Sequence, residues 1–186
     1  MVATSIKQIN SGLTEGKYFF LIKLWSSKGA KTQENLIYRA INLETGLELN
    51  HSDAESLVMN AVSDGADWAN AKYDVSDKEI TFCYERLENQ MDDEFDAFNH
   101  QMILENEDRT DFLVNTVKAR FKSQISNYEN QIEKFKISGR EELIKLPQGK
   151  IRKLSERLEQ LVYEYNLKRN VSSEPKDVIA GVVHVE

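Results

Sequence analysis

Two groups of basic side chains in the second half of the chain are best suited to chemistry, because closely spaced cations contact phosphate groups. The groups are Lys118, Arg120 and Lys122, followed by Lys150, Arg152, Lys153 and Arg157. Residues 107–170 carry 14 Lys and Arg against 10 Asp and Glu, whereas residues 1–106 carry 9 against 18. This segment is therefore the basic part of an acidic chain, and we expect local attraction to nucleic acid there.

The same cations also fit a solvated helical face with ion pairs along the helix, such as Glu133 with Lys136 and Glu141 with Lys145. The second basic group is diluted by three acidic residues, Glu156, Glu159 and Glu164. No stacking aromatic residues are interleaved with the cations, which argues against base-specific recognition. The sequence favours the solvated face, and the alternative is a contact to nucleic acid or to a protein partner.

The remaining reactive side chains form no pattern typical of a metal site. The histidines, His51, His100 and His184, are scattered along the chain. Zinc requires clustered ligands, so we expect solvated or capped histidines. An acidic run contains Asp92, Asp93, Glu94 and Asp96. It lacks the central glycine of a calcium loop, so a solvated helical face is favoured over a magnesium site or a site for a basic partner.

No catalytic set can be assembled from the sequence. Cys83 lies on the apolar side of a predicted helix, which favours a buried, inert thiol over a nucleophile. The chain has no Gly-x-x-x-x-Gly-Lys-Ser/Thr loop to wrap phosphates. A nucleophile, a base and an oxyanion site are not found together. We therefore expect no enzymatic activity from these residues, no metal and no cofactor.

Two segments with helical apolar periodicity must position the cations. The stripes are Val114, Val117, Phe121, Ile125, Tyr128, Ile132 and Phe135, then Ile151, Leu154, Leu158, Leu161 and Tyr165. Stripes this narrow are best buried against another helix. Between them, residues 137–149 contain Gly139, Pro147 and Gly149, which favour a chain reversal. The pattern predicts an antiparallel, coiled-coil-like helical hairpin that ends near Arg169.

The N-terminal part shows strand patterns after a polar, loose start over residues 1–16. Residues 17–26 and 32–42 predict two strands that form a hairpin around Gly29. Leu47 and Leu49 suggest a short third strand. Residues 178–186 are strongly apolar, and we expect them to return and pair with this hairpin.

Helix patterns fill the region between. Ser52 with Glu55, and Ser76 with Glu79, match the capping-box motif at the start of two helices. The first helix should cover residues 53–63, and a connector should follow over 67–74. The apolar phase of the second helix slips at residues 106–110. A bend or short loop there is favoured over a continuous helix with a stutter.

These elements predict an α+β fold: a small antiparallel sheet made by the N-terminal strands and the C-terminal strand, with long antiparallel helices. We expect a single domain over residues 1–186. Its parts are a β-hairpin with a short helix over 1–75, a long-helix arm over 76–169 and the returning strand over 170–186. Short apolar runs, the lack of a leader and a lone cysteine predict a cytoplasmic protein without a membrane partner.

The C-terminal third carries a family pattern. Its sequence is FKSQISNYENQIEKFKISGREE, then KLPQGKIRKLSERLEQLVYEYNLKRNVSSEPKDVIAGVVHVE. A basic helix is followed by a glycine-containing joint at residues 147–150. A leucine-bearing helix closed by Lys168 and Arg169 and a strand over 178–185 complete the pattern. This arrangement over residues 121–186 resembles the C-terminal region of bacterial Swi/Snf-type helicases, which are RapA-like in a broad sense.

The resemblance implies a non-catalytic accessory module of an ATP-dependent helicase. The motor lobes of the parent chain would supply the chemistry. The helical arm would contact DNA, RNA or a protein partner. The alternative from the residues alone is a structural coiled-coil protein that self-associates through its helices and is unrelated to helicases.

Overall fold

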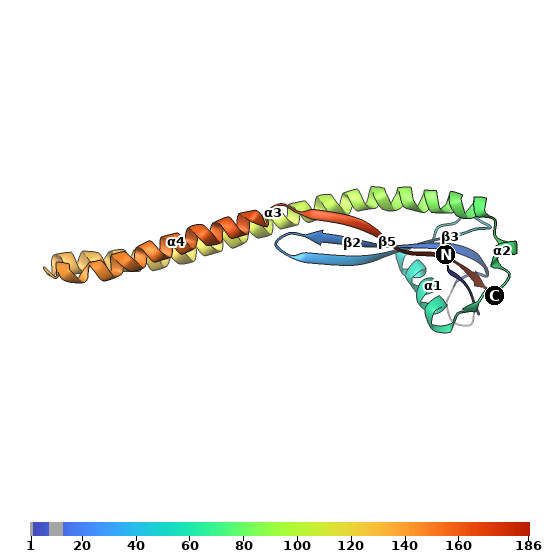
Figure 1. The fold of residues 1–186 in the computed structure, drawn as a ribbon, viewed down its shortest axis with the longest axis horizontal. Helices are drawn as coiled ribbons and strands as arrows, with labels where there is room; N and C mark the ends of the chain where they lie inside the picture. Colours follow the sequence, from blue (N-terminus) through green and yellow to red (C-terminus); the bar gives the residue numbers. More distant parts are fainter. Residues whose placement is uncertain (1, 8–12) are drawn as a thin grey trace. The chain divides into compact units, whose positions relative to one another are not determined.

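The computed structural model describes residues 2–7 and 13–186. It confirms the α+β class, with a five-stranded mixed sheet and long helices (Figure 1). The chain forms two compact units, one made of residues 1–27, 33–99 and 173–186, the other of residues 28–32 and 100–172. Each unit thus combines segments that are distant in sequence. A single domain over residues 1–186 stays a prediction.

The sheet belongs mainly to the first unit and has the strand order β3-β2-β5-β1-β4. The strands are β1 (Val2–Ile6), β2 (Gly16–Lys28), β3 (Thr32–Asn42), β4 (Ala66–Asp67) and β5 (Ser172–Val185). The C-terminal strand lies beside β2, which confirms that it returns to the N-terminal hairpin. It begins at Ser172 rather than at residue 178.

The expected loose start is wrong for residues 2–6, and residues 8–12 lie outside the described part of the chain. Val2–Ile6 forms β1, which pairs in parallel with β5 from Val2 opposite Gly181 to Ile6 opposite Val185. The second edge of β5 presents backbone N–H and C=O groups that need partners, and Val2–Ile6 supplies them. The expected third strand is reduced to one bridge between Ile41 and Glu48.

Side chains of β2 alternate between two apolar layers, as strand geometry requires. On one face Tyr18, Phe20 and Ile22 pack with α1 (His51–Asp64). On the other face Phe19, Leu21 and Trp25 pack with the start of α3 (Asp77–Ile137). The continuous apolar run of β2 is explained by this coverage of both faces. Leu57, Leu87 and Met91 are fully buried in the two layers.

The two expected capping boxes have different outcomes. At α3, the Glu79 N–H donates to Ser76 Oγ and the Ser76 N–H donates to Glu79 Oε2, at 3.3 and 3.0 Å, which confirms the box. At α1, the cap is Asn50, whose side chain accepts from the Asp53 N–H at 2.9 Å, so the Ser52 cap is wrong. The backbone is already extended at Asn50, and the helix therefore begins two residues earlier. The connector over 67–74 holds the short α2 (Ala71–Asp74).

The second unit is a helical hairpin. α3 is one continuous helix from Asp77 to Ile137, so the bend expected at residues 106–110 is wrong. Asn106 and Thr110 are buried, 8% and 1% exposed, and they occupy positions of the stripe between Met102 and Val114. The apolar phase breaks in the sequence because these buried positions are polar, while the helical spacing itself continues.

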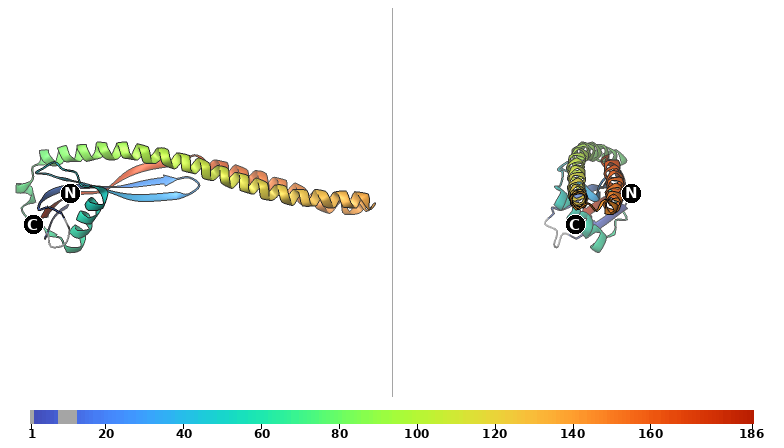
Figure 2. Two further views of the ribbon diagram at one scale, coloured as in Figure 1. Left: turned by 180° about the vertical axis from the view of Figure 1, so that it is seen from behind. Right: turned by 90° about the vertical axis from the view of Figure 1, so that its left-hand side faces the viewer.

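The chain reverses after Ile137 through Gly139, which has a φ of +69°, and a 3-10 helix, η2 (Glu141–Leu143). α4 (Lys145–Leu167) then runs back beside α3, and the two helices are seen side by side from their end in Figure 2. Pro147 and Gly149 lie inside the first turns of α4, not in the reversal. Proline is tolerated there because the first N–H groups of a helix have no partner within it.

Candidate nucleic-acid interface on the helical hairpin

The two apolar stripes face one another but are only partly covered. Val114 and Phe121 are buried in α3. Stripe residues nearer the closed end, such as Tyr128, Ile132 and Leu154, are half-buried. Two helices alone cover one side of each stripe, so the flanks beside the seam stay open to solvent. The hairpin thus has a narrow core and long accessible flanks.

A buried amide sets the register of the hairpin at its open end. Asn106 Nδ2 donates to the carbonyl oxygens of Lys168 and Arg169 at 3.0 and 2.7 Å, which ties the end of α4 to α3. Its Oδ1 accepts from the Ala30 N–H at 2.7 Å. Arg169 also pairs with Asp111. Because register is fixed here, the position of every cation on α4 relative to α3 follows.

The seven predicted contact residues are all exposed: Lys118, Arg120, Lys122, Lys150, Arg152, Lys153 and Arg157. Arg152 lies 3.8 Å from Glu156, and Arg157 donates to Gln160 at 2.8 Å. Lys150 Nζ lies 5.3 Å from the centre of the Tyr128 ring. Among the described residues, the ion pairs expected between Glu133 and Lys136 and between Glu141 and Lys145 do not form. Most of these cations are therefore free of carboxylate partners within the described hairpin.

Helical spacing divides the cations between two flanks. Residues seven apart lie on the same helix face. Arg120, Asn127 and Lys134 share one face of α3, and Lys150 and Arg157 share one face of α4. We call this side, with Gln124, Gln131 and Lys153, the basic flank. Between residues 112 and 137 of α3, no acidic residue lies on the basic flank. On α4, Glu164 is the only acidic residue of this flank.

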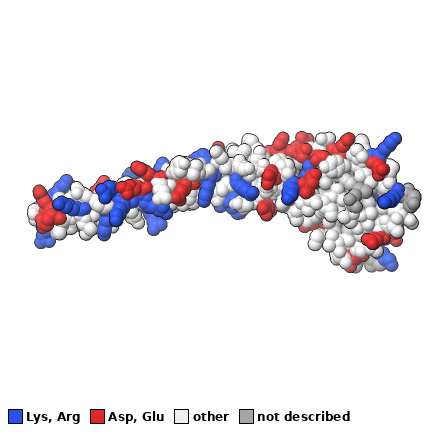
Figure 3. Space-filling model, in the orientation of Figure 1, with Lys and Arg blue, Asp and Glu red and all other residues white. Residues whose placement is uncertain are grey.

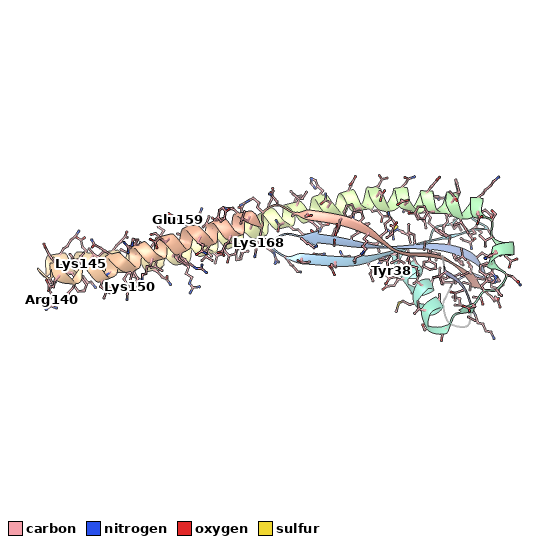
Figure 4. All side chains as sticks on the ribbon, in the orientation of Figure 1. Tyr38, Arg140, Lys145, Lys150, Glu159 and Lys168 are labelled. Atoms are coloured by element: carbon pink, nitrogen blue, oxygen red, sulfur yellow. The ribbon has the colours of Figure 1, made fainter. Side chains whose placement is uncertain are left out.

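The opposite side, which we call the mixed flank, carries both signs of charge. Lys118 lies seven residues after Asp111, Lys122 seven before Glu129, and Arg152 seven before Glu159. Lys150 and Glu159 point to opposite edges of the hairpin in Figure 4. In Figure 3 the lower edge of this unit shows mostly Lys and Arg side chains, whereas the upper edge shows both signs of charge. The structure thus separates Arg120, Lys150, Lys153 and Arg157 from the other three predicted residues.

A groove on the basic flank joins the two helices. It has a volume of about 470 Å³ and is lined by Gln124, Asn127, Tyr128 and Gln131 of α3 and by Lys150, Lys153 and Leu154 of α4. Ammonium and amide N–H groups both donate hydrogen bonds to oxyanions. No carboxylate lines this groove. Its lining suits the binding of an anion.

Sequence reasoning missed the amides and Tyr128. It grouped cations by their proximity in sequence, which places Lys118, Arg120 and Lys122 together although they lie on different faces. The spacing of seven between Arg120, Asn127 and Lys134, and between Gln124 and Gln131, is a signal that could have found this flank.

Part of the acidic run of the first unit forms ion pairs with cations of the same unit. Asp92 and Glu88 accept hydrogen bonds from the buried Lys23 ammonium, at 3.2 and 3.0 Å. Glu94 pairs with Arg39. Burial on its own lowers the pKa of Lys23, but these two carboxylates raise it to a net value above the ordinary one. The basic partners of this run are thus residues of the sheet.

The remaining candidates form no site. Cys83 is buried, and burial raises the pKa of its thiol, which favours the unreactive form. His184 stacks on Trp68 with ring centres 5.0 Å apart, and His51 lies beside Tyr38 at 5.8 Å. His100 is exposed on α3. Within residues 2–7 and 13–186, no group of His, Cys, Asp and Glu could hold a metal ion.

Comparison with protein-family models, with curated proteins and with solved structures finds no match for this chain. None of the helices in the described residues combines the length and the apolarity needed to cross a bilayer. Function is therefore inferred from the geometry and charge of the two units.

Proposed function

We propose that this chain is a non-catalytic accessory module whose helical hairpin contacts the backbone of nucleic acid. The observation that carries the proposal is the basic flank, on which exposed cations of α3 and α4 lie side by side without carboxylate partners. Phosphate contacts of this kind supply affinity without base recognition. The acidic charge elsewhere in the chain restricts such attraction to the hairpin.

The resemblance of residues 121–186 to the C-terminal region of Swi/Snf-type helicases supports a place beside an ATP-dependent motor in the cytoplasm. In that setting the motor lobes of a parent chain hydrolyse ATP, and the hairpin holds the nucleic acid on which they act. The segments that carry the resemblance correspond to the end of α3, the reversal, α4 and β5. The helical hairpin and β5 are thus the parts of this chain that the resemblance covers.

The test is binding of fluorescently labelled duplex DNA to the whole chain over a series of salt concentrations. We expect affinity to fall as salt rises, with a slope of about −0.9 in log–log form for each phosphate contacted. The triple variant K150E/R152E/K153E should abolish binding. Its matched control is reversal of three acidic residues, E129K/E133K/E159K, which should strengthen binding. Absence of salt-dependent binding by the unmodified chain would overturn the proposal.

A second candidate function is self-association through the helices. It is favoured by the exposed apolar residues at the closed end, where Ile137 is 81%, Leu143 42% and Leu146 70% exposed. A second copy could cover these side chains together with the half-buried stripes. Sedimentation over a range of concentrations tests this. A dimer that is lost in I137S/L146S, but not in the control L167S, supports it, and a monomer at all concentrations excludes it.

A further inference from the structure

We infer that a phosphate of a nucleic-acid duplex backbone binds in the groove of the basic flank, between Lys150 and Lys153 and the amides of Gln124, Asn127 and Gln131. This inference rests on the proposed function. It narrows the proposed contact surface from the seven predicted cations to the basic flank. It also adds four residues that the charge pattern does not include, namely the three amides and Tyr128.

The groove brings donors from two helices to one hollow. Lys150 and Lys153 lie one turn apart on α4, while Gln124, Asn127 and Gln131 lie on successive turns of α3. A phosphate has several acceptor oxygens, and it can take hydrogen bonds from ammonium groups on one side and from amides on the other. Asn and Gln contacts to phosphate are common in protein–nucleic-acid interfaces.

Tyr128 acts here as a positioning residue. Its ring lies 5.3 Å from Lys150 Nζ, and a cation is attracted to the face of an aromatic ring. This contact holds the long Lys150 side chain toward the seam, where it would otherwise sample many rotamers. The contact with the ring face does not use all the N–H donors of the Lys150 ammonium. The remaining donors can form hydrogen bonds to an anion.

The occupant is a duplex backbone rather than a single strand. Proteins that bind single strands stack successive bases on aromatic side chains along a groove. Tyr128 is the one aromatic residue that lines this groove, and Lys150 already occupies its ring. Further cations continue along the same flank at Arg120, Lys134 and Arg157. A row of cations without stacking surfaces matches a backbone that presents phosphates and hides its bases.

Two double variants of equal charge test the flank. K150A/K153A removes the groove cations, and K118A/K122A removes two cations from the mixed flank. Binding of the whole chain to a labelled duplex and to a single strand of the same length is measured at several salt concentrations. We expect K150A/K153A to weaken duplex binding at least tenfold and to reduce the salt slope by about 0.9, which corresponds to the one phosphate contact in the groove. K118A/K122A should change affinity by less than about twofold, as expected for long-range charge alone.

Variants of the three amides and of Tyr128 test contributions to binding that do not depend on net charge. Q124A/Q131A should weaken duplex binding about threefold or more without changing the salt slope, because amides release no counterions. Y128L should weaken duplex binding. Y128F, which keeps the aromatic ring, should bind the duplex as tightly as the unmodified chain does. Circular dichroism checks that each variant keeps the helical hairpin.

The outcomes separate this inference from the proposed function. If both lysine pairs weaken binding equally, the hairpin binds nucleic acid but the groove is not its site, and the inference is overturned. Tighter binding of the single strand than of the duplex also overturns it. If the unmodified chain binds neither, the proposed function fails as well.

Discussion

The side chain of Asn106 occupies the space in which a Cβ atom of residue 29 would lie. A Cβ built on Gly29 would be 2.5 Å from Asn106 Oδ1, well inside van der Waals contact. Glycine at this position allows the turn between β2 and β3 to approach α3 closely enough for the Ala30 N–H to donate to that oxygen. One glycine and one buried amide therefore join the turn and the two helices of the second unit.

The first prediction follows from this contact. In G29A the Asn106 side chain must move, and its hydrogen bonds to Ala30, Lys168 and Arg169 lengthen or break. We expect a loss of about 1–3 kcal/mol in the free energy of unfolding, measured by urea denaturation. The control is G149A in α4, where an added Cβ meets nothing within 4 Å. It should stabilise the chain by about 0.5–1 kcal/mol, and equal effects of the two changes would contradict the assignment.

The second prediction concerns the buried ammonium of Lys23. It lies 3.0 Å from Glu88, 3.2 Å from Asp92 and 3.7 Å from Asp177, and its side chain is 5% exposed. In K23M the three carboxylates lose their shared cation and repel one another. The free energy of unfolding should fall by about 2 kcal/mol at neutral pH, in line with hydrogen bonds to charged groups. The exposed Lys31 serves as the control, and K31M should have an effect within about 0.5 kcal/mol.

The third prediction is a loss of stability in alkali. Burial raises the pKa of Tyr84 from 10.0 to about 12, assisted by a hydrogen bond with Glu88 and by the charge of Asp177. The folded chain therefore keeps a proton that the unfolded chain releases. This contribution is fully present below the unfolded pKa and is lost as pH rises through the folded one. Lys23, whose pKa is also raised, adds to the loss with the same sign.

The measurement is urea denaturation at a series of pH values between about 9 and 12, a window that brackets the ordinary tyrosine and lysine pKa values. Stability should be flat at the lower end and should decline above the ordinary tyrosine pKa. In Y84F the decline should be shallower, because one of the two titrating groups is gone. An identical pH profile in Y84F and the unmodified chain would show that Tyr84 does not contribute.

The fourth prediction concerns the passage of β5 between β1 and β2. A Cβ on Gly181 would lie 2.6 Å from the Val2 carbonyl oxygen and 2.6 Å from Phe20 Cε1. G181V should therefore push β1 away from β5 while β2 and β3 remain paired. Hydrogen exchange should show lost protection in residues 2–6 and retained protection in β2. V178A, at a residue 52% exposed, is the control and should leave protection of β1 unchanged.

Local periodicity and capping chemistry, which short peptide segments carry by themselves, determined much of the secondary structure. The sequence correctly predicted the helical stripes of α3 and α4, the hairpin of β2 and β3 and the Ser76–Glu79 box, because each depends on residues that are close together in the chain. It also located the cations of the hairpin. It left open what those cations contact.

Only the tertiary structure decided the features that depend on distant residues. The parallel pairing of β1 requires the free edge of β5, which no local pattern encodes. Asn106 and Thr110 interrupt the apolar stripe in sequence and continue it in space, because both are buried and Asn106 bonds to the end of α4 and to the β2–β3 turn. The basic flank likewise arises when two helices in fixed register bring Lys150 and Lys153 beside Gln124, Asn127 and Gln131. Periodicity places a residue on a face of its own helix, but packing determines which faces meet.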